Sequence, residues 1–523
     1  MPGSGIKADK RRYATTRGRH ALRSRRDLKL NDTQYDIVIV GAGIVGGALA
    51  RELSAYALRI AVIDKASDIP SGASRANSAM IHAGYDDVPG SIKSRFCAPG
   101  NSMYRDLAGI LDFTLEQCGS YVCGFGERDL KTLETLLDQG KRNGVPGVEI
   151  IGGDALRARE PNVSAAITHA LYAPTGSIVN NFEAVLAFMD NAQQNGAELY
   201  LETELRGILL SEDRREVIGA VTDRGIFRAP VVVNAAGVNS DLVARMVGDR
   251  SFSITPVRGE YYIMDKNIGR LVNGFLFACP TPEKGKGVTV APTAERNLLI
   301  GPTSTCQESR DDVSTTAEGL RDIIEDARRM VPGIPLGMAI TTFSGLRASA
   351  DTNDFVLDVP ETPLGFVNVA GIKSPGFTSA PAIALHMTEL MKENLGGRIS
   401  FAPNAHFVPE RKHIPRFDAL SMEEKMRLAA ENPGYAQIVC RCEMVTEAQV
   451  VEAIRRGART VAGVKIWTRA GAGRCQGGFC CPRVIDILAR ELKCSPEEIT
   501  RHGGHSRYLV GRTKDYWFEE KNQ

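Results

Sequence analysis

Two cysteine pairs near the end of the sequence have the residue type and spacing of an electron-transfer centre. Cys440-Arg-Cys442 is followed, after thirty-two further residues, by Cys475-Gln-Gly-Gly-Phe-Cys480. Four thiolates bind a [2Fe–2S] cluster, which carries one electron at a time. Zinc is the main competitor, but structural zinc sites usually contain Cys-x-x-Cys pairs, and neither pair has that spacing. We therefore expect Cys440, Cys442, Cys475 and Cys480 to be cluster ligands.

Disulfide bonds are not expected among the other cysteines. The chain is long, and its first thirty residues lack the apolar core of a secretory signal, so free thiols are the better interpretation. Five cysteines are scattered over the first four-fifths of the chain, where a buried small apolar side chain is the expected role: Cys97, Cys118, Cys123, Cys279 and Cys306.

A glycine-rich segment near the start has the pattern of a dinucleotide-binding unit. Residues 35–40 form an apolar, β-branched run that predicts a buried strand, and residues 41–46 read Gly-Ala-Gly-Ile-Val-Gly. Residues 47–56 have apolar positions at helical spacing, and residues 59–64 predict a second strand. Together they make one complete βαβ unit, which turns an otherwise weak GxGxxG motif into a strong signal.

Four residues of this unit are the expected dinucleotide contacts. Gly41 allows the tight turn, Gly43 lets backbone N–H groups approach a pyrophosphate, and Gly46 permits close packing of helix and strand. Asp64, at the end of the second strand, is expected to accept hydrogen bonds from the adenosine ribose. The helix N-terminus adds positive potential for the phosphates. The fingerprint alone fits both NAD and FAD.

The following residues, up to about 400, predict mixed secondary structure. Residues 229–237 predict a later strand of the nucleotide sheet, ending in small residues where the backbone approaches a ligand. Elsewhere helix-like stretches (102–112 and 316–331) alternate with strand-like ones (261–264, 288–290 and 366–370). The predicted class is α/β: a Rossmann-like nucleotide-binding domain, discontinuous in sequence, interleaved with an α+β substrate domain whose sheet is mixed or antiparallel.

The charge pattern argues against nucleic-acid binding. The chain has a formal net charge of +2, but residues 1–34 alone carry +7, which leaves −5 for the rest. We expect this basic tail to be disordered, and its Arg-rich, acid-poor composition also fits an organelle transit peptide. No run approaches the roughly eighteen apolar residues that would span a membrane. The expected location is the cytoplasm, with organelle targeting by the tail left open.

Five stretches between residues 74 and 376 carry a resemblance to a known family. They are Ser74-Arg-Ala-Asn-Ser-Ala-Met-Ile-His-Ala-Gly84, Val233-Asn-Ala-Ala-Gly237, Arg258-Gly-Glu-Tyr-Tyr262, Phe343-Ser-Gly-Leu-Arg347 and Gly371-Ile-Lys-Ser-Pro-Gly376. Through them, residues 35–400 resemble the D-amino acid oxidase superfamily of flavoproteins, and within it the glycerol-3-phosphate dehydrogenase and oxidase branch, which borders on the L-2-hydroxyglutarate oxidases. The resemblance implies FAD rather than NAD, with Ser78, Gly237 and Gly371 as further cofactor contacts.

The resemblance also implies residues for an alcohol oxidation. A base must take the hydroxyl proton as hydride moves to flavin N5, a role that suits histidine near neutral pH. His82 corresponds to the histidine that these enzymes place beside the flavin, whereas spacing alone would allow a structural histidine equally well. Lys373 is implied near flavin N5 and the pyrimidine edge, and Ser374 at the substrate. Residues 371–376 also fit a plain capping turn.

Arginine residues are the expected ligands of an anionic substrate. The guanidinium group offers a bidentate fork to phosphate or carboxylate. Arg347 matches the arginine that the family uses on the substrate, although Ala348 follows it where the family commonly has proline. Arg258 is a second candidate cation, with a solvated surface arginine as its alternative interpretation.

Three stretches near the C-terminus carry a second resemblance: Cys440-Arg-Cys-Glu443, Thr468-Arg-Ala-Gly-Ala-Gly-Arg-Cys475 and Gln476-Gly-Gly-Phe-Cys-Cys-Pro-Arg483. Residues 436–490 thereby resemble the bacterioferritin-associated ferredoxin type of [2Fe–2S] domain, which implies a small, mainly helical unit. Cys481 departs from the family and is expected to be a bystander thiol, although a ligand exchange with Cys480 is physically possible. Three arginines are expected to offset the cluster's negative charge: Arg441, Arg469 and Arg474.

The sequence therefore divides into five segments. They are a basic tail (1–34), an FAD-dependent oxidoreductase region made of FAD-binding and substrate domains (35–400), a linker (401–434), a [2Fe–2S]-binding domain (435–490) and a C-terminal extension (491–523).

This combination of domains resembles the large catalytic subunit of anaerobic glycerol-3-phosphate dehydrogenases. It implies oxidation of sn-glycerol 3-phosphate to dihydroxyacetone phosphate, with electrons leaving through the cluster to an acceptor protein or a quinone. Association with a partner subunit or with a membrane surface is compatible with that role. The sequence leaves two alternatives open: a 2-hydroxy acid or an amine such as an opine as substrate, or an oxygen-dependent oxidase in which the cluster has a docking or regulatory role.

Overall fold

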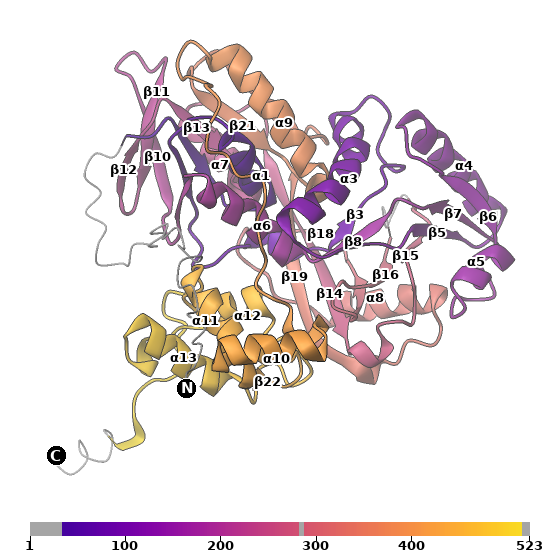
Figure 1. The fold of residues 1–523 in the computed structure, drawn as a ribbon. Helices are drawn as coiled ribbons and strands as arrows, with labels where there is room; N and C mark the ends of the chain where they lie inside the picture. The colour runs from indigo at the N-terminus through magenta and orange to yellow at the C-terminus, as the bar shows by residue number, and fades with distance from the viewer. Residues whose placement is uncertain (1–33, 282–286, 515–523) are drawn as a thin grey trace, which may run out of the picture.

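The structure of the chain, a computed structural model, describes residues 34–281 and 287–514. Figure 1 shows a layered α/β part, a second part built on a broad sheet, and a small helical part below them. The expected disorder and targeting role of the basic tail concern residues 1–33, which lie outside the described residues.

A six-stranded sheet carries the glycine fingerprint. All neighbouring strands are parallel except β20 and β21. Ile37 and Ile39 of β1 pack into one core, whereas Val38 and Val40 pack into another, so both faces of the sheet are covered. The order is β20 (Val356–Asp358), β21 (Phe366–Ala370), β13 (Val231–Asn234), β1 (Ile37–Val40), β2 (Ile60–Ile63) and β9 (Glu198–Tyr200).

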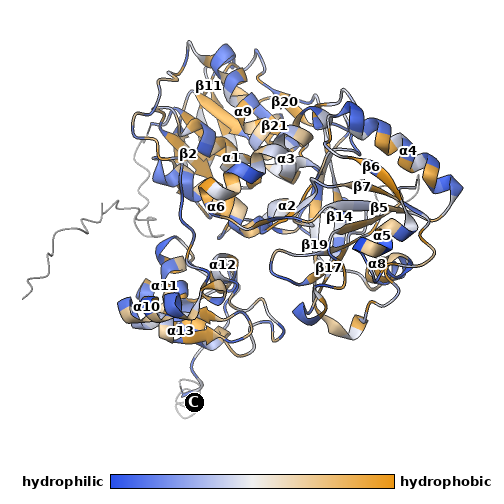
Figure 2. Ribbon diagram, turned by 45° about the vertical axis from the view of Figure 1, so that its right-hand side comes forward, coloured by the Kyte–Doolittle hydropathy of each residue, from blue (hydrophilic) through white to orange (hydrophobic). Residues whose placement is uncertain are grey.

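Helices cover one face of this sheet, and a three-stranded antiparallel sheet covers the other. On the helical side, α1 packs against α6 and α9, and α9 packs against α3. Figure 2 shows the hydrophobic residues of these layers concentrated on the central strands. The elements are α1 (Ile44–Leu53), α3 (Ile92–Leu111), α6 (Asn181–Gln194), α9 (Gly376–Leu395), β10 (Leu205–Leu210), β11 (Val217–Thr222) and β12 (Gly225–Arg228), with the short helices α2 (Gly72–Arg75) and α7 (Ser240–Met246).

Helix α3 is longer than the sequence predicts. The periodicity indicated a helix over residues 102–112, but α3 begins at Ile92. Pro99 and Gly100 interrupt the helical sequence pattern in the first half of α3, so the pattern does not reveal that half as helix. Gly100 is needed there because a Cβ would lie 2.1 Å from the carbonyl oxygen of Thr378, so α3 and α9 cross at close range.

A nine-stranded mixed sheet forms the second part, as expected for the substrate domain. Only β15 and β5 are parallel, and β19 pairs along the whole of β14. The strands are β18 (Thr305–Cys306), β14 (Ile254–Met264), β17 (Leu298–Gly301), β16 (Thr289–Pro292), β15 (Phe275–Ala278), β5 (Ser120–Gly124), β7 (His169–Ala173), β6 (Glu149–Gly152) and β19 (Ala339–Ala350). Helices α4 (Glu127–Arg142), α5 (Gly153–Arg159) and α8 (Ala317–Met330) accompany it, with a small sheet of β3 (Met80–Ile81), β8 (Ser177–Val179) and β4 (Leu115–Gln117).

The scattered cysteines are all free, as expected. Cys97, Cys123 and Cys279 are buried, and Cys118 is half-buried. The expectation of burial is wrong for Cys306, which is exposed because its strand, β18, is a two-residue edge strand paired only with β14.

Short helices and one hairpin form the C-terminal domain. The segment Thr446-Glu-Ala-Gln449 predicts a capped helix start with Val450, Val451, Ile454 and Ala458 on its core face, and in the structure a capping box of Thr446 and Gln449 starts α11. Val450, Ile454 and Ala458 are buried, and Val451 is half-buried. The elements are α10 (Met422–Glu431), β22 (Ile438–Cys440), β23 (Val445–Thr446), α11 (Glu447–Arg455), α12 (Val461–Thr468) and α13 (Cys481–Leu492).

The predicted linker is a packed strap. Arg411 is 4% exposed and pairs with Asp190 on α6 at 3.1 Å. Asn191, next along α6, donates to the carbonyl oxygen of Val408. At the other end of the strap, Gln449 of α11 donates to the carbonyl oxygen of Pro415. The segment therefore fixes the C-terminal domain to the helical face of the first domain.

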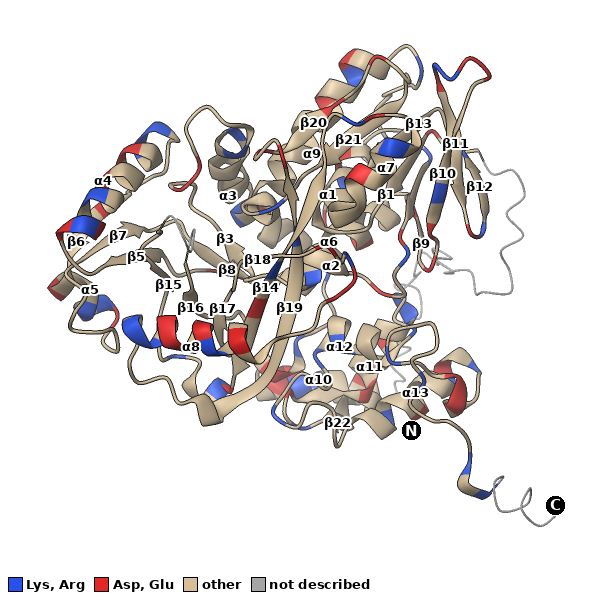
Figure 3. Cartoon of the chain, turned by 180° about the vertical axis from the view of Figure 1, so that it is seen from behind, with Lys and Arg blue, Asp and Glu red and all other residues tan. Residues whose placement is uncertain are grey.

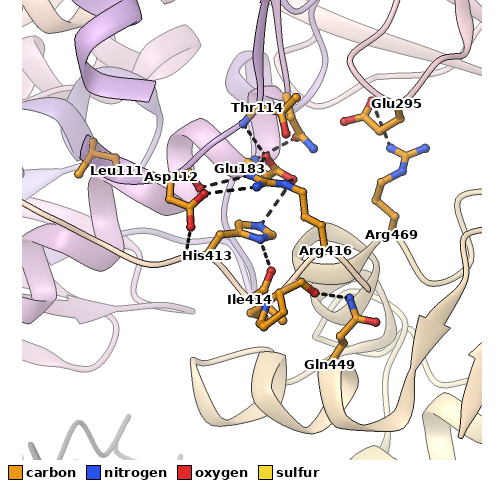
Figure 4. Close-up of polar contacts among 12 residues, drawn as sticks. Leu111, Asp112, Thr114, Glu183, Glu295, His413, Ile414, Arg416, Gln449 and Arg469 are labelled. Carbon is orange, nitrogen blue, oxygen red and sulfur yellow. Dashed lines mark hydrogen bonds and ion pairs between the residues drawn. The ribbon is translucent and has the colours of Figure 1, made fainter. Parts of the chain in front are cut away.

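A buried carboxylate organises the strap (Figure 4). Arg416 donates to Glu183 at 2.9 Å and to Asp112 at 3.3 Å, and the Nε2 of His413 lies 3.5 Å from Glu183. Burial alone would raise the pKa of Glu183, but His413, Arg416 and the N–H of Thr114 lower it to about 2. Burial lowers the pKa of His413 to about 4, so at neutral pH Arg416 supplies the positive charge.

In the part of the chain that the structure describes, none of the helices combines the length and the apolar character needed to cross a membrane.

Candidate functional site

One cavity of about 2040 Å³ connects the three parts of the molecule. Its lining starts at Gly41 and Asp64 in the nucleotide sheet and passes His82 and Arg347. It then reaches the C-terminal domain at Lys465 of α12. Because the fingerprint, the predicted substrate residues and the C-terminal domain share this lining, the cavity is the candidate active site.

Most of the predicted site residues lie just after the carboxyl ends of parallel strands. Gly41 follows β1, Asp64 follows β2, Gly237 lies just after β13, and the segment 371–374 follows β21. Since neighbouring parallel strands end at the same edge of a sheet, residues far apart in the sequence meet there. The fold therefore explains why four distant stretches contribute to one site.

Two fingerprint glycines are required by close backbone contacts. Gly41 has φ +108°, and a Cβ there would lie 2.3 Å from the carbonyl oxygen of Ala235. A Cβ on Gly46 would lie 1.9 Å from the carbonyl oxygen of Gly41, so α1 packs directly on the turn. Gly43 borders the cavity, where the N-terminal N–H groups of α1 begin. This arrangement fits a dinucleotide diphosphate.

Ser74 is a site residue to which the sequence assigned no role. Its Oγ accepts a hydrogen bond from the N–H of Ile44 at 2.9 Å, at the start of α1. A Cβ on Gly43 would come within 2.9 Å of the same oxygen. The signal was present, because Ser74 begins a stretch that carries the family resemblance, but only the fold places it at the helix N-terminus.

Asp64 holds the turn as well as bordering the cavity. Its carboxylate accepts from the N–H of Ala42 at 2.9 Å and from the N–H of Ala66 at 2.8 Å. Burial raises its pKa, and these two hydrogen bonds oppose that shift. Each oxygen keeps further acceptor capacity, so the side chain fits its predicted ribose contact.

The three remaining predicted cofactor residues occupy different positions. Ser78 and Gly237 line the cavity, and Gly237 has φ +56°. Gly371 has φ +65° but lies outside the lining, and a Cβ there would lie 3.0 Å from the Cβ of Ala350. Gly371 thus shapes the loop that carries Lys373.

His82 and Ser374 meet in the cavity. Their Nε2 and Oγ atoms lie 3.2 Å apart, and both residues line the cavity. The backbone N–H of His82 donates to Thr378 Oγ1 at 2.9 Å, and its ring stacks near Phe277 with centroids 6.3 Å apart. The imidazole therefore contacts Ser374, just before α9, and Phe277 of the substrate sheet, while the His82 backbone is bonded to α9.

Lys373 is positioned by two residues that the sequence did not single out. Its Nζ donates to Ser349 Oγ at 3.0 Å and to Asn353 Oδ1 at 3.3 Å. Ser349 lies on β19, two residues after Arg347, and so projects from the same face of the strand. Lys373 is therefore bonded to the strand that carries Arg347, and its neighbour Ser374 is bonded to His82.

The two predicted substrate arginines project from opposite faces of the β14–β19 ribbon. Arg347 pairs in register with Val257, so Arg258, the next residue of β14, points the other way. The Nη2 of Arg347 donates to the carbonyl oxygen of Thr303 at 2.9 Å. Arg258 pairs with Asp312 at 3.5 Å. Both arginines line the cavity, but Arg347 shares its strand face with Ser349, whereas Arg258 lies on the opposite face beside Asp312.

The predicted cluster ligands lie together as two pairs of thiols. The Sγ atoms of Cys442 and Cys475 are 3.9 Å apart, and Cys440 and Cys480 are hydrogen-bonded to each other. Cys440 and Cys480 are buried, whereas Cys442 is exposed and Cys475 is half-buried. Among the described residues, no group of three or more His, Cys, Asp or Glu side chains is placed to hold a metal ion.

In each pair the pKa of one thiol is lowered, that of Cys440 or Cys475, and the pKa of its partner, Cys480 or Cys442, is raised. The hydrogen bond from Cys480 and the N–H groups of Gly471 and Glu443 lower the pKa of Cys440 to about 6 despite its burial. The N–H of Phe479 lowers the pKa of Cys475. Thiolates are the ligands that iron–sulfur clusters require, so this donor set fits a [2Fe–2S] cluster.

Cys481 lies beside the ligands and has its own partner. Its Sγ is 3.9 Å from the hydroxyl of Tyr508, and its thiol is also hydrogen-bonded to that of Cys480. The bystander role of Cys481 therefore stays a prediction, and its contact with Cys480 is compatible with the ligand exchange.

Two of the arginines expected to offset the cluster's charge are paired with carboxylates instead. Arg469 binds Glu443 at 2.9 Å and Glu295 at 3.4 Å (Figure 4 shows the latter contact). Arg474 binds Asp265 at 2.6 Å. Glu295 and Asp265 belong to the substrate domain, so these pairs fasten the cysteine loops to that domain, and their positive charge is largely compensated.

Comparison with protein families divides the chain in the same way. Residues 36–390 match the family described as FAD dependent oxidoreductase. Residues 438–490 match the BFD-like [2Fe-2S] binding domain.

Individual relatives extend this comparison. A glycerol 3-phosphate dehydrogenase from Caloramator mitchellensis is 43% identical over 482 residues, which cover 92% of this chain and 99% of that protein. A glycerol 3-phosphate oxidase from Mycoplasma genitalium is 27% identical and covers 71% of this chain and 97% of its own. The solved structure of the dithionite-reduced L-α-glycerophosphate oxidase from Mycoplasma pneumoniae with FAD bound has a TM-score of 0.68 at 27% identity, covering 72% of this chain and 98% of its own.

Proposed function

Because the chain belongs to the FAD dependent oxidoreductase family and carries a BFD-like [2Fe–2S] domain, we propose that it is a glycerol-3-phosphate dehydrogenase whose electrons leave through the cluster. FAD and a [2Fe–2S] cluster are its cofactors. The observation that supports this substrate most strongly is the 43% identity to a protein of that activity over nearly the full length of both chains.

The reaction removes a hydride from the carbon and a proton from the hydroxyl group of the secondary alcohol, two electrons and two protons in all, and leaves a ketone. When bound, FAD supplies the hydride acceptor at N5, and the cluster supplies a one-electron carrier. His82 takes the hydroxyl proton at Nε2, the ring nitrogen that faces Ser374. Ser374 orients the imidazole and contacts the substrate. Lys373, held by Ser349, adds positive charge beside them.

Arg347 is the proposed ligand of the substrate phosphate. It lines the cavity, and its contact with the carbonyl oxygen of Thr303 uses one of its five N–H donors. The remaining donors are available for a bidentate contact with an anion. Arg258 lies on the other face of the ribbon with Asp312, so we do not include it in the phosphate site.

The shape of the cavity supports an internal route for the electrons. Its lining runs from the fingerprint glycines to α12, and α12 leads directly into the loop that bears Cys475. Cys440 and Cys480 are buried on the protein side, whereas Cys442 is exposed. The exposed side is where an external acceptor, a protein or a quinone, would approach.

Anaerobic flavin bleaching tests the proposed substrate. We expect sn-glycerol 3-phosphate to bleach the flavin absorbance of the purified protein, with L-2-hydroxyglutarate and amino acids much slower at equal concentration. Bleaching by the hydroxy acid or by an amine, and none by the phosphate ester, contradicts the proposal and favours those substrates.

A second candidate is an oxygen-dependent oxidase with the cluster in a regulatory or docking role. The oxidase from Mycoplasma genitalium favours it, since that protein aligns along 97% of its length while leaving more than a quarter of this chain unmatched. Stoichiometric hydrogen peroxide, formed at an unchanged rate after Cys442→Ser, would support this candidate. We expect little peroxide from the wild-type protein when an electron acceptor is present.

A further inference from the structure

Three cations from two domains line the cavity near one another, because the charges of Arg75 and Arg501 both act on Lys465. Arg75 ends α2, in the segment that follows Asp64 and Ser74. Lys465 lies on α12 of the C-terminal domain, and Arg501 lies in the segment after α13 that the sequence placed in a C-terminal extension. Figure 3 shows positive charge on α2, with α12 lying next to it.

Direct hydrogen bonds hold these segments together. The hydroxyl of Thr460, the N-cap of α12, donates to Asp68 at 2.7 Å. Ser67 donates to the carbonyl oxygen of His502 at 2.7 Å. A Cβ on Gly463 would lie 2.1 Å from Asp68, so the first turn of α12 is seated on the loop between β2 and α2. The C-terminal domain therefore touches the loop that carries the nucleotide-binding residues.

The charges at this contact are not balanced. Within residues 34–281 and 287–514, no ion pair joins any of these three cations to a carboxylate. Asp68 is the one acidic group whose charge raises the pKa of Arg75. Burial lowers the pKa of Lys465, and the neighbouring charges of Arg75, Arg469 and Arg501 lower it further. The Nζ of Lys465 is 3.5 Å from Gln476 Oε1, which is a marginal contact. Like charges gathered in a cavity wall favour a bound anion.

The place of these three cations in the cavity favours a dinucleotide diphosphate as the anion. Arg75 directly follows Ser74, whose hydroxyl is bonded to the first N–H of α1. The N-terminus of α1 is where a dinucleotide diphosphate binds in this fold. The predicted substrate group, His82 with Ser374, Lys373 and Arg347, is carried by other elements of the cavity wall.

We propose that Lys465 of the C-terminal domain, together with Arg75, binds the diphosphate of FAD, with Arg501 supporting the charge. The cluster domain then completes the flavin site instead of only receiving electrons from it. Because FAD would bind more tightly when α12 is docked, FAD occupancy and docking of the cluster domain stabilise each other by the same factor. This inference depends on FAD as the cofactor and is independent of which alcohol or amine is oxidised.

FAD affinity of the apoprotein is the direct test. Flavin is removed from the wild type and from Lys465→Met, and each is titrated with FAD while the fluorescence of free flavin is followed. We expect Lys465→Met to weaken FAD binding about tenfold or more, the usual worth of a charged hydrogen bond. Arg455→Met, which removes an exposed positive charge from α11 of the same domain, is the matched control and should leave affinity within about twofold.

Further variants separate the possible causes of a change. Lys465→Arg should retain most of the affinity, and iron content should equal that of the wild type in every variant, which shows that the domain is folded. Unchanged FAD affinity in Lys465→Met overturns the inference, and so does an equal loss in Arg455→Met. A raised KM for glycerol 3-phosphate at saturating FAD, without a change in FAD affinity, would assign Lys465 to the substrate and also overturn it. If Lys465→Met does not fold, Arg75→Met must show the loss of affinity.

Discussion

The flavin site lies at the ends of parallel strands that are buried on both faces, whereas the cluster ligands lie at the ends of short elements and in the loops of the C-terminal domain. In the first site, close backbone packing fixes the positions of Gly41 and Gly46 before any ligand binds. In the second, one of the four thiols is exposed to solvent and another is half-buried. The fold alone therefore forms the flavin site, whereas the cluster site depends more on the bound cluster.

The strongest test of this difference removes a cluster ligand. Cys442→Ser should abolish reduction of external one-electron acceptors, because electrons can no longer leave through the cluster, while anaerobic flavin bleaching by substrate continues at the wild-type rate. Stopped-flow absorbance and acceptor assays measure the two steps separately. Cys494→Ser, outside the paired thiols, is the control and should behave as the wild type. If bleaching is lost together with acceptor reduction, the two sites are not separable in this way.

Removing the proposed base should affect the flavin site and leave the cluster site intact. We expect His82→Asn to slow flavin reduction about 10²- to 10⁴-fold, since proton abstraction by a positioned base contributes about that much. Ser374→Ala should have a smaller effect, because Ser374 orients the imidazole. Iron content and cluster absorbance should be unchanged. A reduction rate within a few fold of the wild type would remove His82 from the mechanism.

Substitution of Arg347 and of Arg258 should have different effects on substrate binding. Arg347→Met should raise KM for glycerol 3-phosphate about tenfold to a hundredfold, as expected for a lost charged contact. Arg258→Met should change KM by less than about threefold, because this residue points to the opposite face of the ribbon. Steady-state kinetics with one acceptor gives both values. Equal effects of the two substitutions would contradict the assignment made from the strand register.

The strap that connects the two regions should weaken in acid. Glu183→Gln is expected to cost about 2 kcal/mol of unfolding free energy at pH 7, because Arg416 then loses its buried partner but keeps Asp112. Since the folded-state pKa of Glu183 is lowered to about 2, its contribution is complete above its usual pKa of 4.5 and is lost as the pH falls from there towards 2. His413, whose pKa is lowered to about 4, adds a loss of stability between its usual 6.5 and 4.

Thermal unfolding of the wild type and Glu183→Gln at several pH values checks this prediction. The difference between their midpoints should be largest near pH 7 and should shrink below pH 4.5. Glu431→Gln, which removes an exposed i,i+4 partner of Arg427 on α10, is the control and should shift the midpoint little at any pH. A difference that stays constant down to pH 3 would show that the carboxylate charge is not what Glu183 contributes.

Local sequence patterns were sufficient for the elements that bind the nucleotide. The strand–glycine–helix order around Gly41 and the capping box at Thr446 depend on neighbouring residues, and both appear where the sequence predicts them. The start of α3 was missed because Pro99 and Gly100 break the helical pattern locally. Its helical continuation depends on packing against α9, which no local pattern reports.

Contacts between distant residues could not be predicted in the same way. The register of β14 and β19, which separates Arg258 from Arg347, joins strands about ninety residues apart. His413 and Glu183 are more than two hundred residues apart and belong to segments that the sequence assigned to a linker and a domain interior. The pairing of Arg469 with Glu295 likewise depends on how the domains dock. In each case tertiary packing determines the partner.

We propose that electrons pass from the flavin to the cluster within one chain. The most direct measurement is electron paramagnetic resonance of anoxically purified protein, frozen after addition of sn-glycerol 3-phosphate, with the flavin absorbance recorded on the same sample. We predict that the flavin bleaches and that the signal of a reduced [2Fe–2S] cluster appears in the wild type and is absent in Cys442→Ser. A bleached flavin with a cluster that stays oxidised in the wild type would contradict the account.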